Sequence, residues 1–102
     1  MSTIYQPPPH EQQLPNAIGR ELRRRRRAAD LSQAAVAAPF TRALVCAVER
    51  GRVTPSIPAL AVFLEHLGID FDEFFRGVQS EMTVAYTHRR EDHDQAPSRR
   101  RR

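Results

Sequence analysis

Residues 31–52 read LSQAAVAAPFTRALVCAVERGR, and the helix boundaries within this segment determine the predicted fold. Ser32 has a hydroxyl that can accept a hydrogen bond from a helix N-terminus, so it predicts a short helix over residues 33–38. Pro39 ends that helix, because proline removes a backbone donor and clashes with the preceding turn. A tight turn is therefore expected directly after this short helix.

The second half of the stretch predicts another helix, over residues 42–50. Thr41 is a good cap for its N-terminus. Val45 and Val48 are three residues apart, as the buried face of a helix requires, and Gly51 stops the helix. Two short helices joined by a tight turn form the predicted centre of the fold.

Upstream of this centre, the sequence predicts one helix and a polar arm. Ile18, Leu22 and Ala29 fall on one face of a helix over residues 17–29. Residues 1–16 contain four prolines among polar residues, which indicates a disordered or polyproline arm.

Downstream, the sequence predicts two further helices. Ser56 caps the fourth helix and Gly68 closes it. The apolar stripe of this helix consists of Leu60, Phe63, Leu64 and Leu67. Asp70 and Glu73 have the spacing of a capping box, which opens a last short helix. That helix carries Phe71, Phe74 and Phe75. The single predicted domain therefore covers residues 17–76 and is all-α, compact and five-helical.

The C-terminal extension, residues 77–102, is predicted to lie outside the domain. Met82, Val84 and Tyr86 alternate with polar residues within 81–90 and favour a short strand. One or two of the phenylalanines are expected to join this segment in a dimer contact. Residues 96–102 end the chain as a solvated, arginine-rich tail.

Composition excludes several classes of protein. After the ends are set aside, roughly 60 residues remain for a core, which leaves little room for a catalytic cleft. No Ser/His/Asp or paired-carboxylate arrangement stands out, so the chain is predicted not to be an enzyme, and no cofactor or metal is expected. One cysteine, Cys46, forbids an intrachain disulfide and suits a reducing cytosol. No apolar run approaches the ~20 residues of a membrane span, and no secretory signal is visible.

Charge is unevenly distributed along the chain. All 16 basic residues are arginine and the net charge is +4. Residues 18–52 hold nine arginines against three acids, whereas 53–75 hold four acids and no arginine. A basic surface on one half of the domain suits contact with a polyanion. The five arginines of residues 23–27 point all round a helix and cannot all touch one partner. Some are expected to contact phosphates and others to be solvated or ion-paired.

A set of short motifs resembles the lambda repressor-like (XRE/Cro-type) helix-turn-helix family over residues 18–75. In order, the motifs are Ile18-Gly19-x-x-Leu22, Arg26, Leu31-Ser32-Gln33, Thr41-Arg42, Val48-Glu49-Arg50-Gly51-Arg52, Pro55-Ser56, Leu67-Gly68-Ile69-Asp70 and Asp72-Glu73-Phe74-Phe75. No single motif is specific, but their order and spacing are.

The resemblance implies a DNA-binding surface. In such domains the second helix braces the phosphate backbone and the third enters the major groove. The residues that then occupy DNA-contacting positions are Gln33, Thr41, Arg42, Ala43, Cys46, Ala47, Arg50 and Arg52. Arg42 is the only long donor at a groove-facing position and can take guanine bidentately. Arg26 and Glu49 match a family ion pair that joins the first helix to the third.

Two departures from the family pattern stand out. Gln33 and Glu49 are about two residues closer than usual, which favours a shortened second helix, and Pro39 stands where glycine is usual and cannot adopt a positive φ. The third helix is unusually apolar, so that Ala43 and Ala47 can at best touch thymine methyls.

These observations predict a sequence-specific transcriptional regulator of bacterial or phage type, a repressor or an activator. It would bind double-stranded promoter or operator DNA as a homodimer, in the cytoplasm and associated with the nucleoid. An alternative is a protein-interaction adaptor that uses the apolar third helix against RNA polymerase, a second regulator or a toxin. A third possibility is a non-specific architectural binder, which rests on the arginine runs.

Overall fold

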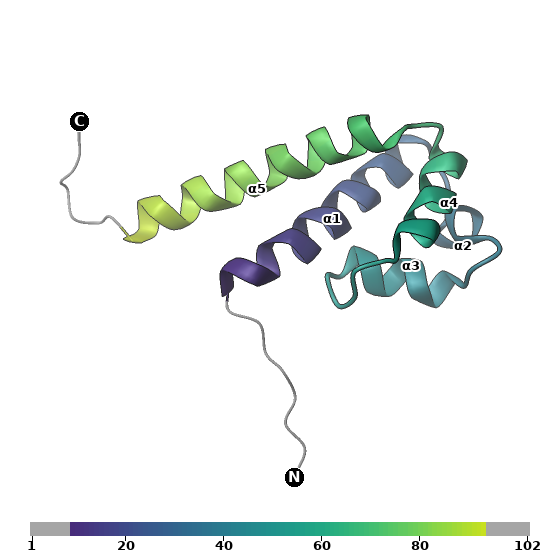
Figure 1. The fold of residues 1–102 in the computed structure, drawn as a ribbon, viewed down its shortest axis with the longest axis horizontal. Helices are drawn as coiled ribbons and strands as arrows, with labels where there is room; N and C mark the ends of the chain where they lie inside the picture. Colours follow the sequence, from purple (N-terminus) through teal and green to yellow (C-terminus); the bar gives the residue numbers. More distant parts are fainter. Residues whose placement is uncertain (1–8, 94–102) are drawn as a thin grey trace, which may run out of the picture.

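The computed structural model describes the backbone of residues 9–93 and the side chains of residues 12–83 (Figure 1). The described part is all-helical, which confirms the predicted fold class. Its helices are α1 (Pro9–Ala28), α2 (Gln33–Ala37), α3 (Arg42–Glu49), α4 (Ile57–Leu67) and α5 (Phe71–His93). None of the described helices is both long enough and apolar enough to cross a bilayer.

The predicted N-cap residues lie at the N-termini of four of these helices. They are Ser32, Thr41, Ser56 and Asp70, and in each case a side-chain oxygen accepts a hydrogen bond from the backbone N–H three residues further on. The donor–acceptor distances are 3.0, 3.1, 3.2 and 2.8 Å respectively. Each cap satisfies an N–H group that the helix itself leaves without a partner. Local chemistry thus fixes where α2 to α5 begin.

The long helices α1 and α5 run antiparallel, and α2, α3 and α4 pack together beside the C-terminal half of α1 (Figure 1). The core lies between these two groups. Its largest buried apolar side chains are each at most 2 % exposed; they are Leu22, Val36, Val45, Val48, Leu60, Phe63, Leu64, Phe74 and Val78. Ala29, which we expected on the buried face of the first helix, is exposed because α1 ends before it.

The start of the first helix differs from the prediction. We expected it at residue 17, after a proline-rich arm, but α1 begins at Pro9 and contains Pro15. The reason is tertiary contact. The side-chain amide of Gln12 donates to the carbonyl of Gly51, 2.9 Å away, and to Asn16 Oδ1 at 3.2 Å. The N-terminal turns of α1 are therefore held against the turn that follows α3. Residues 1–8 of the predicted arm lie outside the described residues.

The end of the last helix also differs. The strand predicted within 81–90 is wrong, because α5 continues without a break to His93. Phe74, Val78 and Met82 recur every four residues, and all three pack on the core. This helical period along α5, which packs against α1, outweighs the alternation that suggested a strand. The predicted tail, residues 96–102, lies outside the described residues.

The turn between α2 and α3 contains a cis peptide bond between Ala38 and Pro39. No residue of this turn has a positive φ, in keeping with a proline at the position where the family has glycine. The Phe40 N–H donates to the carbonyl of Ala37, 2.6 Å away, and His66 of α4 forms a 2.7 Å hydrogen bond with the carbonyl of Ala38. The turn is thus anchored to α4. The second helix spans five residues, which agrees with the favoured shortening.

Candidate nucleic-acid interface

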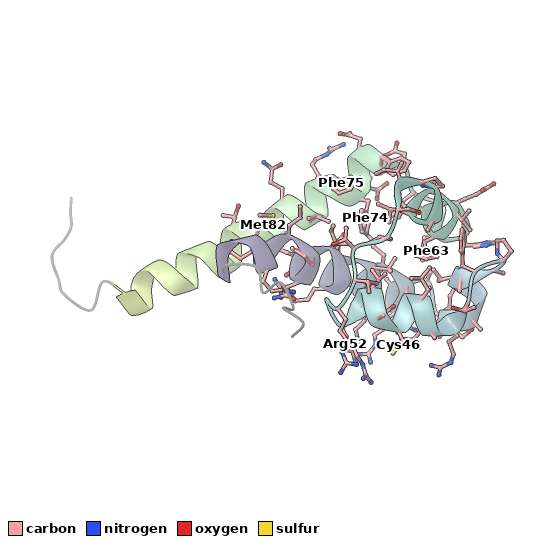
Figure 2. All side chains as sticks on the ribbon, turned by 60° about the horizontal axis from the view of Figure 1, so that its bottom comes forward. Cys46, Arg52, Phe63, Phe74, Phe75 and Met82 are labelled. Atoms are coloured by element: carbon pink, nitrogen blue, oxygen red, sulfur yellow. The ribbon has the colours of Figure 1, made fainter. Side chains whose placement is uncertain are left out.

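One side of α3 is buried and the other faces outward. Val45 and Val48 are fully buried, whereas Ala43 is exposed and Cys46 and Ala47 are partly exposed. Figure 2 shows Cys46 on the outer side of α3, away from the core. The exposed face of the short helix α3 is therefore free to enter a groove of a larger partner.

The remaining residues predicted to contact DNA surround this face. Thr41, Arg42, Arg50 and Arg52 are exposed, and Gln33 is half-buried at the start of α2. The structure therefore brings Gln33, Arg42, Cys46 and Arg50 together around one hollow, and Arg52 lies on the same side of the molecule as Cys46 (Figure 2).

Beside α3, Arg26 and Glu49 form a largely buried ion pair. Arg26 Nε lies 2.6 Å from Glu49 Oε2, and Arg26 Nη2 lies 3.1 Å from Glu49 Oε1. Arg26 also donates to the carbonyl of Leu31, 2.9 Å away. The hydrogen bond from Arg26 to Glu49 raises the pKa of the Arg26 guanidinium above its ordinary value. The pair joins the end of α1 to the end of α3, and pairs of this kind fix geometry more than they add net stability.

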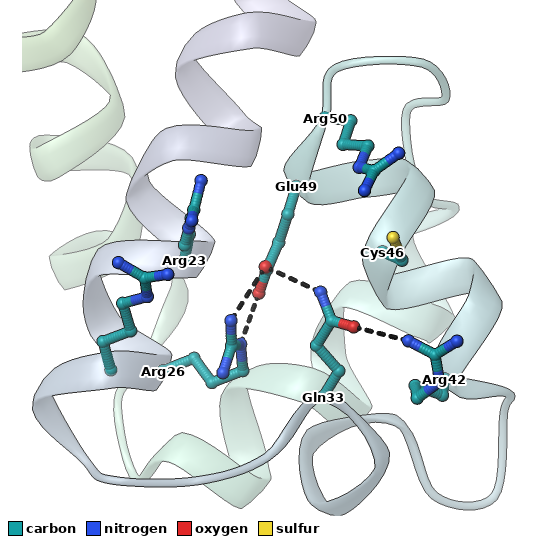
Figure 3. A pocket seen from close by; sticks show the side chains of 8 residues that line it. Arg23, Arg26, Gln33, Arg42, Cys46, Glu49 and Arg50 are labelled. Atoms are coloured by element: carbon teal, nitrogen blue, oxygen red, sulfur yellow. Dashed lines mark hydrogen bonds and ion pairs between the residues drawn. The ribbon is translucent and has the colours of Figure 1, made fainter.

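Gln33 extends this pair towards the outer face of α3 (Figure 3). Its amide nitrogen donates to Glu49 Oε1 at 3.0 Å, and its amide oxygen accepts from Arg42 Nη1 at 3.0 Å. Because Glu49 can only accept, it orients the Gln33 amide so that the oxygen faces Arg42. Sequence reasoning placed Gln33 on DNA but missed this link, which depends on how α2 and α3 meet.

Hydrogen bonds thus link Arg26 to Glu49, Glu49 to Gln33 and Gln33 to Arg42. These four residues line a hollow of about 260 Å³ between α1, α2 and α3 (Figure 3). The hollow is lined by Arg23, Arg26, Arg27, Gln33, Arg42, Cys46, Glu49 and Arg50. Five guanidinium groups thus surround a single carboxylate. Some arginines of the run at residues 23–27 were expected to contact phosphates, but the sequence did not single out Arg23 and Arg27. The i, i+4 spacing within the arginine run was the available signal that they share a face.

On the side of α1 that faces α5, a buried carboxylate binds two more arginines. Glu21 is 1 % exposed and accepts hydrogen bonds from Arg24, at 3.0 and 2.7 Å, and from Arg25, at 2.7 Å. Arg25 also donates to Glu73 of α5, 2.7 Å away. Burial raises the pKa of the Glu21 carboxyl, but the hydrogen bonds from the two arginines outweigh burial and lower its pKa overall. The Arg25–Glu73 bond joins α1 to α5, and the bonds to Glu21 hold Arg25 in position for it.

Comparison with known proteins agrees with this geometry. A family model described as a helix-turn-helix domain matches residues 17–74, which is more than half of the chain. No curated protein and no solved structure matches the chain. The matched segment contains every residue that lines the hollow and the whole of α3.

Proposed function

The chain belongs to the helix-turn-helix domain family, and from this premise we propose that it is a sequence-specific transcriptional regulator that binds promoter or operator DNA as a homodimer. The observation that carries the proposal is the position of α3. It presents a free face flanked by Arg42, Arg50 and Arg52, none of which forms an ion pair with any residue among 12–83. Unpaired guanidinium groups beside a rod of helical width suit a major groove bordered by phosphates.

Sequence preference would rest on few contacts. Arg42, held by Gln33, has the fork of donors that takes guanine O6 and N7 together. Ala43 and Ala47 offer only methyl groups, which suit the methyl of thymine. Most of the affinity would come from phosphates, and it would fall steeply with salt.

The aromatic residues at the start of α5 support a dimer. Phe71 and Phe75 are 37 % and 36 % exposed, and their rings stack with centroids 6.2 Å apart. Pairing two copies across a two-fold axis would cover such a surface and present two copies of α3 about 34 Å apart, one turn of DNA. A regulator of this kind works where the chromosome is, so we propose a cytoplasmic, nucleoid-associated location.

A footprint of the purified full-length chain on genomic DNA tests the proposal. We expect protected sites with two half-sites one helical turn apart. A gel shift that shows no preference for any protected fragment over random duplex at physiological salt would remove the proposal.

A second candidate, an adaptor that uses α3 against a protein such as RNA polymerase, is favoured by one observation. The outer face of α3 carries Ala43, Cys46 and Ala47 where a base reader commonly has polar side chains. Arg42→Ala separates the two candidates. A base reader loses about 1–3 kcal/mol of binding free energy on its preferred site and becomes less specific. An adaptor keeps its DNA binding unchanged and loses its protein partner.

A further inference from the structure

The arginine run at residues 23–27 divides into two sets in the folded chain. Arg24 and Arg25 are bound by Glu21, and Arg26 is bound by Glu49. Arg23 and Arg27 are exposed and form no ion pair with any residue whose side chain the structure describes. Two of the five charges therefore remain available to a partner.

The two available arginines share a face of α1. They are four residues apart, so their side chains are neighbours on the helix, and like charges at this spacing repel each other. Both line the hollow between α1 and α3, together with Arg42 and Arg50 of α3. In Figure 3, Arg23 and Arg50 lie on opposite sides of this hollow. Four arginines without a carboxylate partner thus line one hollow from two helices.

The one carboxylate in the hollow does not offset this charge. Glu49 is 4 % exposed, and its two oxygens already accept bonds from Arg26 and Gln33. The pair with Arg26 is neutral as a unit, so Glu49 neither neutralises Arg23 and Arg27 nor repels an incoming anion.

We infer that this hollow binds a backbone phosphate of DNA, with Arg23 and Arg27 of α1 and Arg50 of α3 as its donors. The inference rests on the proposed function and adds α1 to the interface. The planar fork of a guanidinium matches the oxygens of a phosphate. DNA is the source because the hollow opens beside Arg42 and Cys46 on the outer face of α3, so a strand flanking the groove that receives α3 passes over it.

The test measures salt dependence with two matched variants of the full chain. Arg23→Gln/Arg27→Gln removes the two charges from the hollow. Arg20→Gln/Arg76→Gln removes two charges outside the hollow, because neither residue lines it. In the folded chain Arg20 pairs with Glu81 and Arg76 with Asp72. Affinity for a random-sequence duplex is measured from about 50 to 200 mM salt. Thermal unfolding of both variants establishes that each one folds.

The first variant should lower the slope of log affinity against log salt by about 0.9, which is the change expected for the loss of one phosphate contact. It should weaken binding to a footprinted site and to random duplex by the same factor. The second variant should keep the wild-type slope. If the first variant also keeps the wild-type slope, the inference is overturned while the proposed function stands. If the wild-type chain binds no duplex at the lowest salt, the proposed function itself fails.

A further measurement separates DNA from a free anion as the source of phosphate. Sodium tripolyphosphate is added to the wild-type chain without DNA, and the unfolding temperature is followed. A site for free polyphosphate would show stabilisation that Arg23→Gln/Arg27→Gln abolishes, together with an unchanged salt slope on duplex. That combination would overturn the assignment to DNA.

Discussion

The carboxylate of Glu21, on α1, lies directly against the backbone of Gly77, on α5. A Cβ atom built at Gly77 would lie under 3.0 Å from both carboxylate oxygens of Glu21, closer than real Cβ contacts allow. An alanine here would have to displace the Glu21 carboxylate, which Arg24 and Arg25 hold in place, and this accounts for a glycine in the middle of a helix, where it is otherwise unfavourable.

Gly77→Ala is predicted to destabilise the protein. Helix propensity alone would make this change stabilising by about 0.5–1 kcal/mol. The added methyl group must instead displace the carboxylate from its arginines or push the helices apart, which typically costs about 1–3 kcal/mol. Urea unfolding measures the difference, with Ser80→Ala on the exposed side of α5 as the control. A Gly77→Ala protein as stable as the wild type would contradict the close contact.

Glu21→Gln is predicted to make stability less dependent on pH. The pKa of Glu21 is lowered in the folded chain from its ordinary value of 4.5. Its contribution to stability is therefore present above pH 4.5 and is lost as the pH falls through the lower folded pKa. Removing the charge should cost about 3 kcal/mol at pH 7, the low end for a broken buried pair, because Arg24 is 56 % exposed.

Unfolding in urea at several pH values measures this effect. The gap between wild type and Glu21→Gln should narrow as the pH falls below 4.5. A gap of constant size down to acid pH would show that the Glu21 charge contributes nothing to folding.

Gln33→Ala is predicted to reduce sequence preference without unfolding the chain. Gln33 holds the guanidinium of Arg42 by a hydrogen bond and is itself half-buried. Its loss should lower the preference for a footprinted site over random duplex by about 1 kcal/mol, the low end for a bidentate base contact. Competition gel shifts measure the ratio, with Gln79→Ala on α5 as the control. Equal weakening on both duplexes would instead assign Gln33 to a phosphate.

Thr41→Ala is predicted to destabilise α3 from its N-terminus. The hydroxyl of Thr41 accepts a hydrogen bond from the N–H of Leu44, 3.1 Å away. Loss of a cap typically costs about 1 kcal/mol. Thermal unfolding compares this variant with Thr54→Ala, in the loop before α4, which should change stability by less than about 0.5 kcal/mol. Equal effects at the two sites would show that the cap does not stabilise α3.

The features that sequence predicted well are those that short-range chemistry determines. A cap such as Ser56 acts on a backbone group three residues away, and Gly68 ends α4 through its own left-handed conformation. Both can be identified without knowledge of any other helix. The apolar stripes of the short helices were also predicted correctly, because burial follows from their period.

The features that sequence predicted poorly depend on contacts between distant residues. Pro15 argued against a helix, yet Gln12 and Asn16 are held against Gly51, which lies about one third of the chain further on. The alternation of Met82, Val84 and Tyr86 suggested a strand, yet α5 is helical to His93 and packs against α1. The Gln33 link to Glu49 likewise required the packing of α2 on α3. Such contacts leave no local pattern in the sequence.

The arginine run shows how identical residues acquire different tolerances to substitution. A neutral replacement of Arg25 leaves the buried Glu21 with one guanidinium fewer, so it is felt throughout the α1–α5 layer. The same replacement at Arg23 leaves the fold intact and changes only what the surface attracts. Natural variants of this chain should therefore keep arginine at residue 25 because folding needs it, and keep it at residue 23 only where the partner is a polyanion.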